Sequence, residues 1–317
     1  MKTLAVVLQE PESLAVRQLD LTDAGEADVI VDVEWSGIST GTEKLLWNGR
    51  MPAFPGMGYP LVPGYESVGR VSEAGARAGL AVGERVFVPG ANCFNGARGL
   101  FGGAASRLVV PAKRVLPVDE ALGERAILLA LAATAYHAVA GGGKRKQLSP
   151  PDLIIGHGVL GRLLARMVVL GGYPAPTVWE LNPQRSQGAT GYQVLTPEAD
   201  PRRDYRAIYD VSGDSNLLDT LIGRLAPGGE VVLAGFYSDR ISFSFPPAFM
   251  REAQIRAAAE WQRPDLLAAN SLVEDGTLSL DDLITHHERV EHADSAYRTA
   301  FGDAACLKMV LDWRTLQ

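Results

Sequence analysis

Cysteine is scarce in this chain. Two of its 317 residues are cysteines, Cys93 and Cys306, and they lie far apart in the sequence. Two isolated thiols cannot supply the cysteine pairs of a zinc ribbon or the framework of a disulfide-rich secreted fold. A reducing compartment is the simplest expectation, and we predict a cytoplasmic protein.

Long apolar runs are absent as well. No stretch reaches the ~20 apolar residues that a membrane-spanning helix needs. The longest candidate, residues 126–140, is shorter and contains Tyr136 and His137. The N-terminus has a short apolar run without the cleavage site of a secretory signal, so we expect a first strand there. The sequence predicts no transmembrane segment and leaves peripheral membrane contact open.

Positive charge is in the minority. The chain has 30 Lys and Arg residues against 37 Asp and Glu, a formal net charge of -7 at pH 7. Binding to nucleic acid requires basic patches that neutralise phosphates, so we predict no nucleic-acid partner. A hydrophobic share of 47% and a charged share of 21% are ordinary for a globular chain. The length allows two domains, each with its own core.

The first 120 residues are rich in β-branched residues, glycine and proline. They predict short strands at 29–33, 67–72, 85–89 and 108–110. No helix-rich stretch is expected before Glu120, which is typical of a partly open β-barrel. Residues 47–64 are rich in glycine and proline and read as a long functional loop.

The pattern changes further along the chain. Residues 120–141 read as a helix that ends at Gly141–Gly143, and 144–146 as a basic, solvated turn. From Asp152 strands alternate with helices, which predicts βαβ units and a parallel sheet. The expected strands are 153–155, 177–181, 207–211 and 230–234, and the expected helices are 162–170 and 216–225. From Leu283 we expect a strand, a helix and a strand.

A glycine-rich turn follows the first strand of this region. Residues 156–161 have the G-x-G-x-x-G spacing, between an apolar strand and an amphipathic helix. Such a turn lets the backbone approach a pyrophosphate at the helix N-terminus. The residues expected to bind the cofactor here are Gly156, Gly158, Val159, Leu160 and Gly161. We expect His157, inside the turn, to point to solvent.

An acidic residue follows the next strand. Glu180 lies about 20 residues after the turn, where an acid binds the adenosine ribose hydroxyls and repels a 2′-phosphate. This favours NAD over NADP, although the nearby Arg185 could serve a phosphate. Ser212 and Gly235 follow two later strands and either pass over the cofactor or belong to plain α/β architecture.

The motifs resemble those of the medium-chain dehydrogenase/reductase superfamily over essentially the whole chain. The segments that carry the resemblance are Gly83–Val88, Gly102–Pro111 and Thr134–Ala138. The resemblance implies an α/β protein with a GroES-like β-barrel catalytic domain, 1–120 completed by 278–317, and a doubly wound Rossmann domain, 121–277. It also implies that Thr134 faces the nicotinamide, unless it bonds its own helix, and that the protein is a homo-oligomer.

Further segments resemble the dehydrogenases of bacteriochlorophyll biosynthesis. They are 36–44, 51–66, 246–250, 257–261 and 306–313. The resemblance implies NAD-dependent oxidation of the C3 1-hydroxyethyl group of a chlorin or bacteriochlorin pigment to acetyl. Two alternatives stay open: a zinc-free quinone or enone reductase, which Glu180 disfavours because such enzymes use NADPH, and a non-catalytic NAD(H)-binding pigment carrier.

Zinc ligands are missing from the expected positions. The zinc-dependent members carry cysteine where this chain has Ser39, histidine where it has Tyr65, and a third ligand on the linking helix, near Leu129 and Ala130. Only Glu66 could bind a metal, and a catalytic zinc needs three protein ligands. We therefore predict a reaction without metal.

Without a metal, a side chain must accept the proton of the alcohol. The candidates are Tyr65, Glu66, Thr40 and His137, with the hydroxyls of Ser39 and Thr42. Structural alternatives exist for three of them. Glu66 could form a buried pair with an arginine, Tyr65 could fill the vacant metal volume, and His137 could be a core residue.

A flat pigment needs a pocket with aromatic walls and cations at its rim. The residues expected to form it are Ser39, Trp47, Phe54, Tyr59, Phe94 and Phe101. Lys44, Arg50 and Arg98 are the nearby cations. The alternative is that these aromatic residues form a small core under two loops.

Overall fold

The computed structural model describes residues 1–141 and 149–316. The expected turn at 144–146 and the glycines Gly142 and Gly143 lie outside the described residues. Contacts divide the chain into unit 1, Met1–Ala130 with Leu283–Gln317, and unit 2, Leu131–Asp282. The expected boundaries, after residues 120 and 277, lie about ten and five residues before the boundaries that the contacts give, after Ala130 and Asp282. Within the described ranges, no helix has the length and apolarity to cross a membrane.

Unit 1 is built from two sheets of mainly antiparallel strands. The first has the order β7-β2-β1-β4-β8 and the second β10-β6-β5-β3-β18-β17, with β9 paired to β3. Their bounds are β1 Lys2–Glu10, β2 Ser13–Leu21, β3 Asp28–Ile38, β4 Leu61–Val62, β5 Ser67–Ala74, β6 Arg85–Val88, β7 Phe94–Asn95, β8 Arg98–Gly99, β9 Arg107–Pro111, β10 Leu116–Pro117, β17 His286–Arg289 and β18 Met309–Asp312. The strands expected from β-branched alternation are confirmed.

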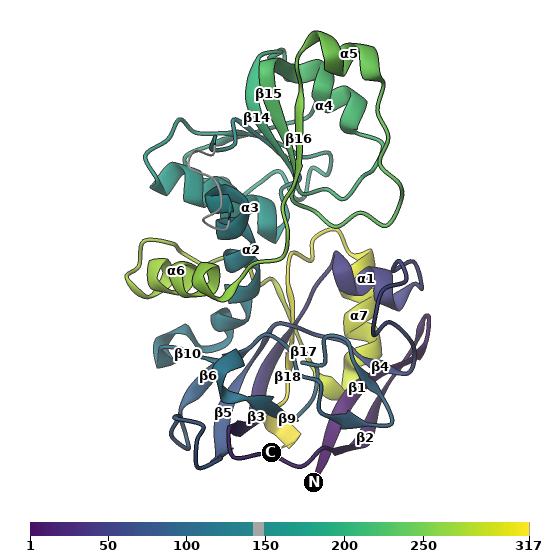
Figure 1. Ribbon diagram of the computed structural model, residues 1–317, viewed down its shortest axis with the longest axis vertical. Coiled ribbons are helices and arrows are strands. Elements are labelled where there is room, and N and C mark those ends of the chain that lie inside the picture. Colours follow the sequence, from purple (N-terminus) through teal and green to yellow (C-terminus); the bar gives the residue numbers. More distant parts are fainter. Residues whose placement is uncertain (142–148, 317) are drawn as a thin grey trace. The chain divides into compact units, whose positions relative to one another are not determined.

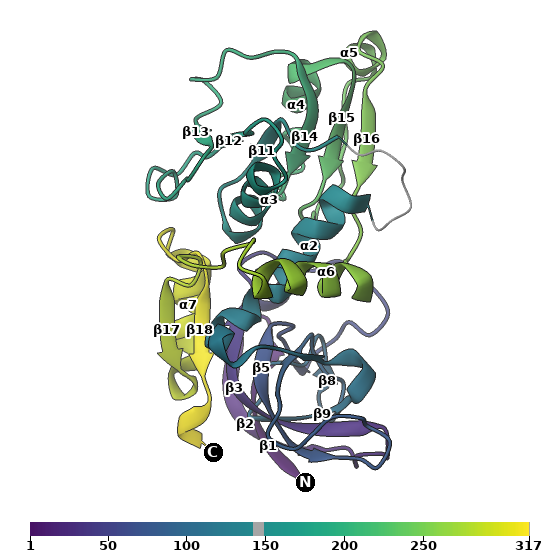
Figure 2. The ribbon, with the colours of Figure 1, turned by 90° about the vertical axis from the view of Figure 1, so that its left-hand side faces the viewer.

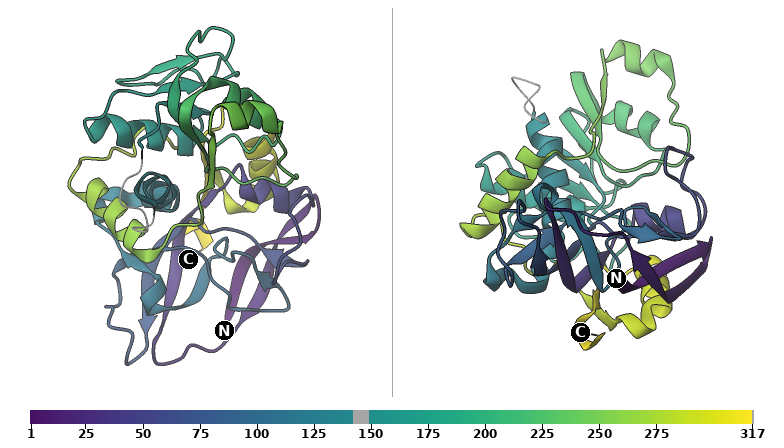
Figure 3. Two further views of the ribbon diagram at one scale, coloured as in Figure 1. Left: turned by 45° about the horizontal axis from the view of Figure 1, so that its top comes forward. Right: turned by 60° about the horizontal axis from the view of Figure 1, so that its bottom comes forward.

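The C-terminal segment completes unit 1. Strands β17 and β18 run parallel to each other, and β18 pairs antiparallel with β3, so that Met309 lies opposite Ile38. Helix α7 (Ala293–Gly302) lies against this pair, as Figure 2 shows. The expected order of strand, helix and strand after Leu283 is confirmed. Figure 3 marks both chain ends, Met1 and the C-terminus, which belong to unit 1.

Two helical segments of unit 1 differ from expectation. The short helix α1 (Thr42–Trp47) lies in a region where no helix was expected. It has six residues and no side-chain cap at Gly41, so neither periodicity nor a capping residue predicts this helix from the sequence. The expected helix from Glu120 begins instead as the 3₁₀ segment η2 (Glu120–Leu128), which is kinked at Gly123, and continues as α2 (Leu129–Ala140).

Unit 2 contains a parallel sheet. Its strand order is β13-β12-β11-β14-β15-β16, the doubly wound order expected of a Rossmann domain. Figure 1 shows β14, β15 and β16 side by side, with α4 and α5 close to them. The bounds are β11 Leu153–Ile155, β12 Thr177–Trp179, β13 Gln193–Leu195, β14 Tyr205–Asp210, β15 Leu225–Leu233, β16 Gln254–Ala257, α3 Val159–Leu170, α4 Leu218–Arg224, α5 Phe245–Met250 and α6 Arg263–Glu274. The expected α/β fold class is confirmed.

The register of this sheet aligns four strand ends. Ile155 of β11 lies opposite both Trp179 of β12 and Asp210 of β14, and Asp210 lies opposite Leu233 of β15. The residues that follow these strands therefore meet at one edge. Ligands of open α/β sheets bind at this carboxyl edge, where the strand order reverses.

Candidate active site

The glycine turn has the geometry of a phosphate-binding turn. Gly156 has φ +100°, which disfavours any side chain. A Cβ on Gly161 would lie 1.9 Å from the carbonyl oxygen of Gly156, so only glycine allows α3 to begin this close to β11. A Cβ on Gly158 would meet nothing within 4 Å among the described residues, which leaves space above the N-terminus of α3.

Glu180 lies beside this turn. Its Oε2 accepts a hydrogen bond from the backbone N–H of His157 at 3.0 Å, and its Oε1 accepts one from the N–H of Asn182 at 2.8 Å. Both bonds hold the carboxylate at the end of β12. The arrangement suits recognition of ribose hydroxyls and opposes a phosphate at the same position.

The expectation that His157 points to solvent is wrong. Its side chain is 0% exposed, because Nδ1 contacts the carbonyl oxygen of Arg185 at 2.6 Å and Nε2 contacts the hydroxyl of Tyr192 at 2.8 Å. Burial lowers the pKa of His157 to about 4, so the ring is neutral at pH 7. Arg162 of α3 also donates to the carbonyls of Arg185 and Gln187. These contacts fix the loop after Glu180 against the turn.

The other predicted cofactor residues gather at the same edge of the sheet. The Cα of Ser212 would lie 3.8 Å from a Cβ on Gly156, and a Cβ on Gly235 would lie 3.0 Å from the backbone nitrogen of Gly213. Val159 and Leu160 form the first turn of α3. Thr134 lies half-buried on α2. Their roles in cofactor binding stay predictions.

Unit 1 contains a buried ion pair that the sequence left open. Glu66 is 0% exposed and Lys308 is 1% exposed, and Lys308 Nζ donates to Glu66 Oε2 at 2.5 Å. Lys308 also donates to the carbonyl of Ile38 at 3.3 Å. Burial raises the pKa of Glu66, and the ammonium of Lys308 opposes that rise. The buried pair that was the structural alternative for Glu66 is present, but its partner is Lys308, so the expectation of an arginine is wrong.

Glycine at position 37 makes room for this carboxylate. A Cβ on Gly37 would lie 2.4 Å from Glu66 Oε2. The second oxygen, Glu66 Oε1, has no hydrogen-bond partner within the described part of the chain. A buried acceptor without a donor is costly, so Oε1 is available to a bound hydroxyl or water.

Two predicted hydroxyl groups meet next to Glu66. The hydroxyl of Tyr65 donates a short hydrogen bond to Ser39 Oγ. Burial and the charges of Glu66 and Glu43 raise the pKa of Tyr65, so its hydroxyl keeps its proton. The ring of Phe101 packs edge-on against Tyr65, with centroids 5.2 Å apart. Thr40 is half-buried beside Ser39.

Sequence reasoning missed Glu43. It lies in α1 and is 0% exposed. Its Oε1 accepts from the backbone N–H of Ser39 at 3.1 Å, and its Oε2 accepts from the hydroxyl of Tyr297 at 3.0 Å. A glutamate in a short helix without amphipathic periodicity reads as a surface residue, so only its tertiary contacts reveal it.

This cluster does not fit a zinc site. Ser39 Oγ accepts the Tyr65 hydroxyl, and one oxygen of Glu66 is held by an ammonium group. Zinc prefers thiolate, imidazole and unpaired carboxylate ligands. Across residues 1–141 and 149–316, no group of three or more His, Cys, Asp or Glu side chains is placed to hold a metal ion. A reaction without metal stays a prediction.

His137 belongs to unit 2, where it pairs with an aspartate. Its Nδ1 lies 2.8 Å from Oδ2 of Asp265, and both side chains are buried. Asp265 also accepts from the N–H of Gln262, closing the capping box of α6. The contact joins α2 to α6. A catalytic role for His137 stays a prediction, and its geometry favours the structural alternative.

The predicted pocket residues do not form one group. Trp47 and Tyr59 pack against the small core of Leu8, Leu46, Met51 and Leu61, and the Tyr59 hydroxyl donates to the carbonyl of Leu46. Phe94 belongs to the main core of unit 1 and Phe54 is exposed. Phe101 and Ser39 lie with Tyr65. The alternative of a small core under the loops therefore accounts for Trp47 and Tyr59.

Comparison with known proteins gives results over the full length of the chain. Residues 25–120 match the family model described as "Alcohol dehydrogenase GroES-like domain". Two proteins named 2-desacetyl-2-hydroxyethyl bacteriochlorophyllide A dehydrogenase are similar over 99% of this chain and 99% of their own lengths. The one from Rhodobacter capsulatus is 57% identical and the one from Cereibacter sphaeroides is 54% identical.

Solved structures share the fold at lower identity. 2R,3R-butanediol dehydrogenase from Bacillus subtilis has a TM-score of 0.82 at 19% identity and covers 98% of this chain and 99% of its own. L-idonate 5-dehydrogenase from Escherichia coli has a TM-score of 0.84 at 18% identity and covers 98% of each chain. At these identities the likeness concerns the fold alone.

Proposed function

This chain belongs to the medium-chain dehydrogenase/reductase superfamily and, within it, to the family of the hydroxyethyl bacteriochlorophyllide dehydrogenases, and from that membership we propose its reaction. We propose that it oxidises the C3 1-hydroxyethyl group of a chlorophyllide or bacteriochlorophyllide to an acetyl group, with NAD as the hydride acceptor. The observation that carries the proposal is an identity above one half to two dehydrogenases of that name, over their full lengths.

The turn of unit 2 supports the cofactor assignment. The glycines at 156, 158 and 161 leave the backbone open to a pyrophosphate at the N-terminus of α3. Glu180 is held at the turn by two backbone N–H groups, where its charge favours a ribose diol over a 2′-phosphate. NAD is therefore the proposed coenzyme.

The hydroxyl pair of unit 1 supports the assignment of the proton chemistry. Alcohol oxidation removes a hydride from carbon and a proton from oxygen. Glu43 and Glu66 are fully buried, whereas Tyr65 is only half-buried and can be reached by a substrate. We therefore assign the hydroxyl of Tyr65 to contact the alcohol oxygen. Because the reacting carbon is attached to a conjugated ring, positive charge that develops on it is delocalised. Weaker polarisation of the alcohol than a metal provides is then sufficient.

Phe101 supports an apolar, planar substrate. Its ring packs edge-on against Tyr65, and an aromatic wall next to the reacting hydroxyl suits a flat macrocycle. Glu66 contributes a fixed negative charge, held by Lys308, with Oε1 free to accept a hydrogen bond.

The test is direct turnover. Purified protein is mixed with NAD and 3-hydroxyethyl bacteriochlorophyllide, and both the absorbance of NADH and the long-wavelength band of the pigment are followed. The proposal predicts equimolar NADH and acetyl product. Absence of both changes would overturn it, and oxidation of NADPH by a quinone under the same conditions would favour the reductase alternative.

A further inference from the structure

We propose that His157 is a positioning residue for the choice of coenzyme. Its side chain holds the loop 181–192 against the glycine turn, and this keeps the carboxylate of Glu180 in position for a ribose diol. The inference rests on the proposed coenzyme and adds to it a side chain that was expected to point to solvent. The 181–192 loop leads from Glu180, after β12, to the start of β13.

The carboxylate of Glu180 is held by donors on two different segments. The backbone N–H of His157, in the glycine turn, donates to Oε2 at 3.0 Å. The backbone N–H of Asn182, in the 181–192 loop, donates to Oε1 at 2.8 Å. Both bonds form together only while the turn and the loop keep a fixed separation. A contact that ties the loop to the turn therefore also sets the position of the carboxylate.

The side chain of His157 provides such a tie. It is 0% exposed, and Nδ1 lies 2.6 Å from the carbonyl oxygen of Arg185 while Nε2 lies 2.8 Å from the hydroxyl of Tyr192. A carbonyl oxygen only accepts, so Nδ1 carries the proton and donates. Burial lowers the pKa of His157 to about 4, so the ring is neutral at pH 7 and Nε2 accepts from Tyr192. One ring thus bonds to two points of the 181–192 loop.

Arg162 of α3 strengthens the same tie. Its Nε donates to the carbonyl of His157 at 3.1 Å, and its Nη2 donates to the carbonyls of Arg185 at 3.0 Å and Gln187 at 2.7 Å. A Cβ on Gly188 would lie 2.5 Å from Arg162 Nη1, so the loop packs directly on the guanidinium group. The loop is therefore joined to the turn through His157 and to α3 through Arg162.

This arrangement distinguishes the two coenzymes at the adenosine ribose. NADP differs from NAD by a phosphate on the 2′ oxygen, and a carboxylate fixed at that place accepts from a diol and repels the phosphate. If the loop is released, Glu180 loses the fixed donor from Asn182 and its carboxylate turns away from the ribose. NAD then loses binding energy and NADP loses a repulsion. His157 therefore acts on the ratio of the two affinities, through Glu180, and leaves the transfer of hydride unchanged.

Calorimetry with NAD and with NADP tests the role of His157. His157→Phe keeps a ring of similar size but loses both hydrogen bonds. We expect the ratio of affinities, NAD over NADP, to fall by ~10-fold, the size of effect that loss of buried hydrogen bonds produces. His157→Asn keeps a donor near the place of Nδ1 and should retain more of the ratio. In pigment turnover, His157→Phe should raise KM for NAD and leave kcat near the wild-type value.

Two tyrosines of unit 2 give a matched pair of variants. Tyr192→Phe removes the donor to His157 Nε2 and should lower the affinity ratio, by less than His157→Phe does. Tyr205 begins β14, at the end of that strand opposite to the ligand edge, and donates to Asp200 Oδ2 at 2.6 Å. Tyr205→Phe should cost stability and keep the wild-type ratio. If His157→Phe kept the same ratio as Tyr205→Phe, the proposal would be overturned.

A second measurement uses the wild type without coenzyme. Nitrogen-15 NMR at pH 7 should show the ring of His157 with a protonated Nδ1 and an unprotonated Nε2, in signals that His157→Phe lacks. A protonated Nε2 would overturn the proposed tie to Tyr192, because that nitrogen could no longer accept.

The outcomes separate this inference from the proposed function. A protein whose variants shift the affinity ratio as described but which oxidises no pigment would contradict the proposed reaction and support the role of His157. A wild type without preference for NAD would contradict the coenzyme assignment and, with it, the role of His157. Oxidation of the pigment with NAD, together with an unchanged ratio in His157→Phe, would contradict the role of His157 alone.

Discussion

The buried pair of Glu66 and Lys308 shows how strongly the stability of this protein depends on a single residue. Neither side chain reaches solvent, so each depends on the other for its charge. Lys308→Met leaves a buried carboxylate without its partner, which destabilises a protein by ~3–5 kcal/mol. We expect the free energy of unfolding, measured in urea, to be lower by about this amount in Lys308→Met than in the wild type.

A double variant and a surface control complete this test. Glu66→Gln combined with Lys308→Met removes both charges, and we expect it to regain most of the lost stability. Lys113→Met replaces an exposed lysine and should change the free energy of unfolding by less than ~0.5 kcal/mol. Equal stabilities of Lys308→Met and Lys113→Met would contradict the account of a buried ion pair.

Glu180 is the residue that we propose discriminates between the two coenzymes. In Glu180→Ala the charge that opposes a 2′-phosphate is removed, together with the acceptor for the N–H groups of His157 and Asn182. We expect the ratio of kcat/KM for NAD over NADP to fall by ~10-fold or more, the effect of about 1.4 kcal/mol. Steady-state kinetics with both coenzymes measure it, and an unchanged ratio would show that Glu180 does not discriminate.

The proposed cofactor site depends, at the scale of elements, on the contact between β11 and α3. Gly161→Ala places a Cβ 1.9 Å from the carbonyl of Gly156, so the helix must move away from the turn. We expect lower stability and a loss of NAD affinity in calorimetry. Gly158→Ala meets no described protein atom within 4 Å, so it should fold normally and lose affinity alone.

A glycine in another helix serves as the control for this pair. Gly223 lies in α4, and a Cβ there would meet nothing within 4 Å among the described residues. Gly223→Ala should keep wild-type affinity for NAD. If Gly161→Ala bound NAD as tightly as Gly223→Ala does, close packing of α3 on the turn would not be needed for binding.

Regular elements were predictable where their patterns extend over several residues. The alternation in β3 and the amphipathic run of α3 follow directly from side-chain periodicity. Helix α1 and the 3₁₀ segment η2 were not predictable, because six residues or a kink at Gly123 leave too little pattern. Glu43 was missed for the same reason, since it belongs to α1.

Side-chain partners depend on tertiary contacts. The sequence placed Ser39, Tyr65 and Glu66 at equivalent positions of one site, and the structure brings Ser39 and Tyr65 into contact. Lys308 could not be paired with Glu66 from the sequence, because 241 positions lie between them and no local pattern links them. Trp47 and Tyr59 were expected in the pocket but pack in a small core. The composition of a loop does not tell whether its aromatic side chains face a core or a pocket.

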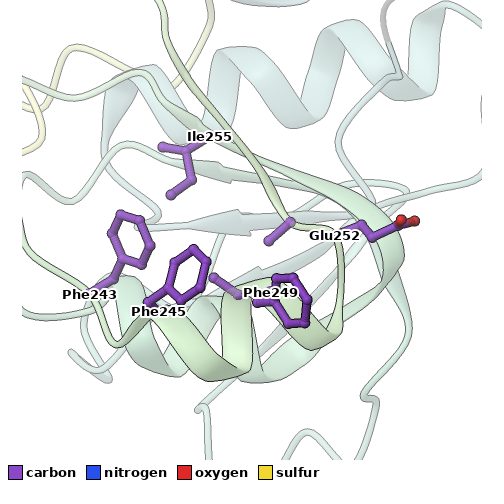
Figure 4. Close-up of a pocket in the computed structure, with 7 residues that line it drawn as sticks. Phe243, Phe245, Phe249, Glu252 and Ile255 are labelled. Atoms are coloured by element: carbon purple, nitrogen blue, oxygen red, sulfur yellow. The ribbon is translucent and has the colours of Figure 1, made fainter.

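At the scale of the whole molecule, we propose that the expected homo-oligomer forms through unit 2. Phe245, Phe249 and Met250 of α5 are 67%, 65% and 77% exposed. Phe245 and Phe249 line a hollow of about 300 Å³ together with Phe243 and Ile255. In Figure 4 these aromatic rings gather on one side while Glu252 points away from them.

The neighbouring strand supports a second copy as the occupant. Within the described residues, β16 ends the sheet and pairs with β15 alone, so its outer edge can pair with the same edge of a symmetry-related copy. Phe249→Asp places a charge in that interface, and we expect light scattering to show a smaller assembly than for the wild type. Phe54→Asp, an exposed aromatic residue of unit 1, is the control; equal masses for both variants would contradict the assignment.

The most direct test of the account follows the hydrogen itself. The 3-hydroxyethyl pigment is prepared with deuterium on the carbinol carbon and incubated with the protein and NAD, and the nicotinamide product is analysed by mass spectrometry and NMR. The account predicts one deuterium at C4 of NADH for each acetyl group formed. Acetyl product with unlabelled NADH would contradict it.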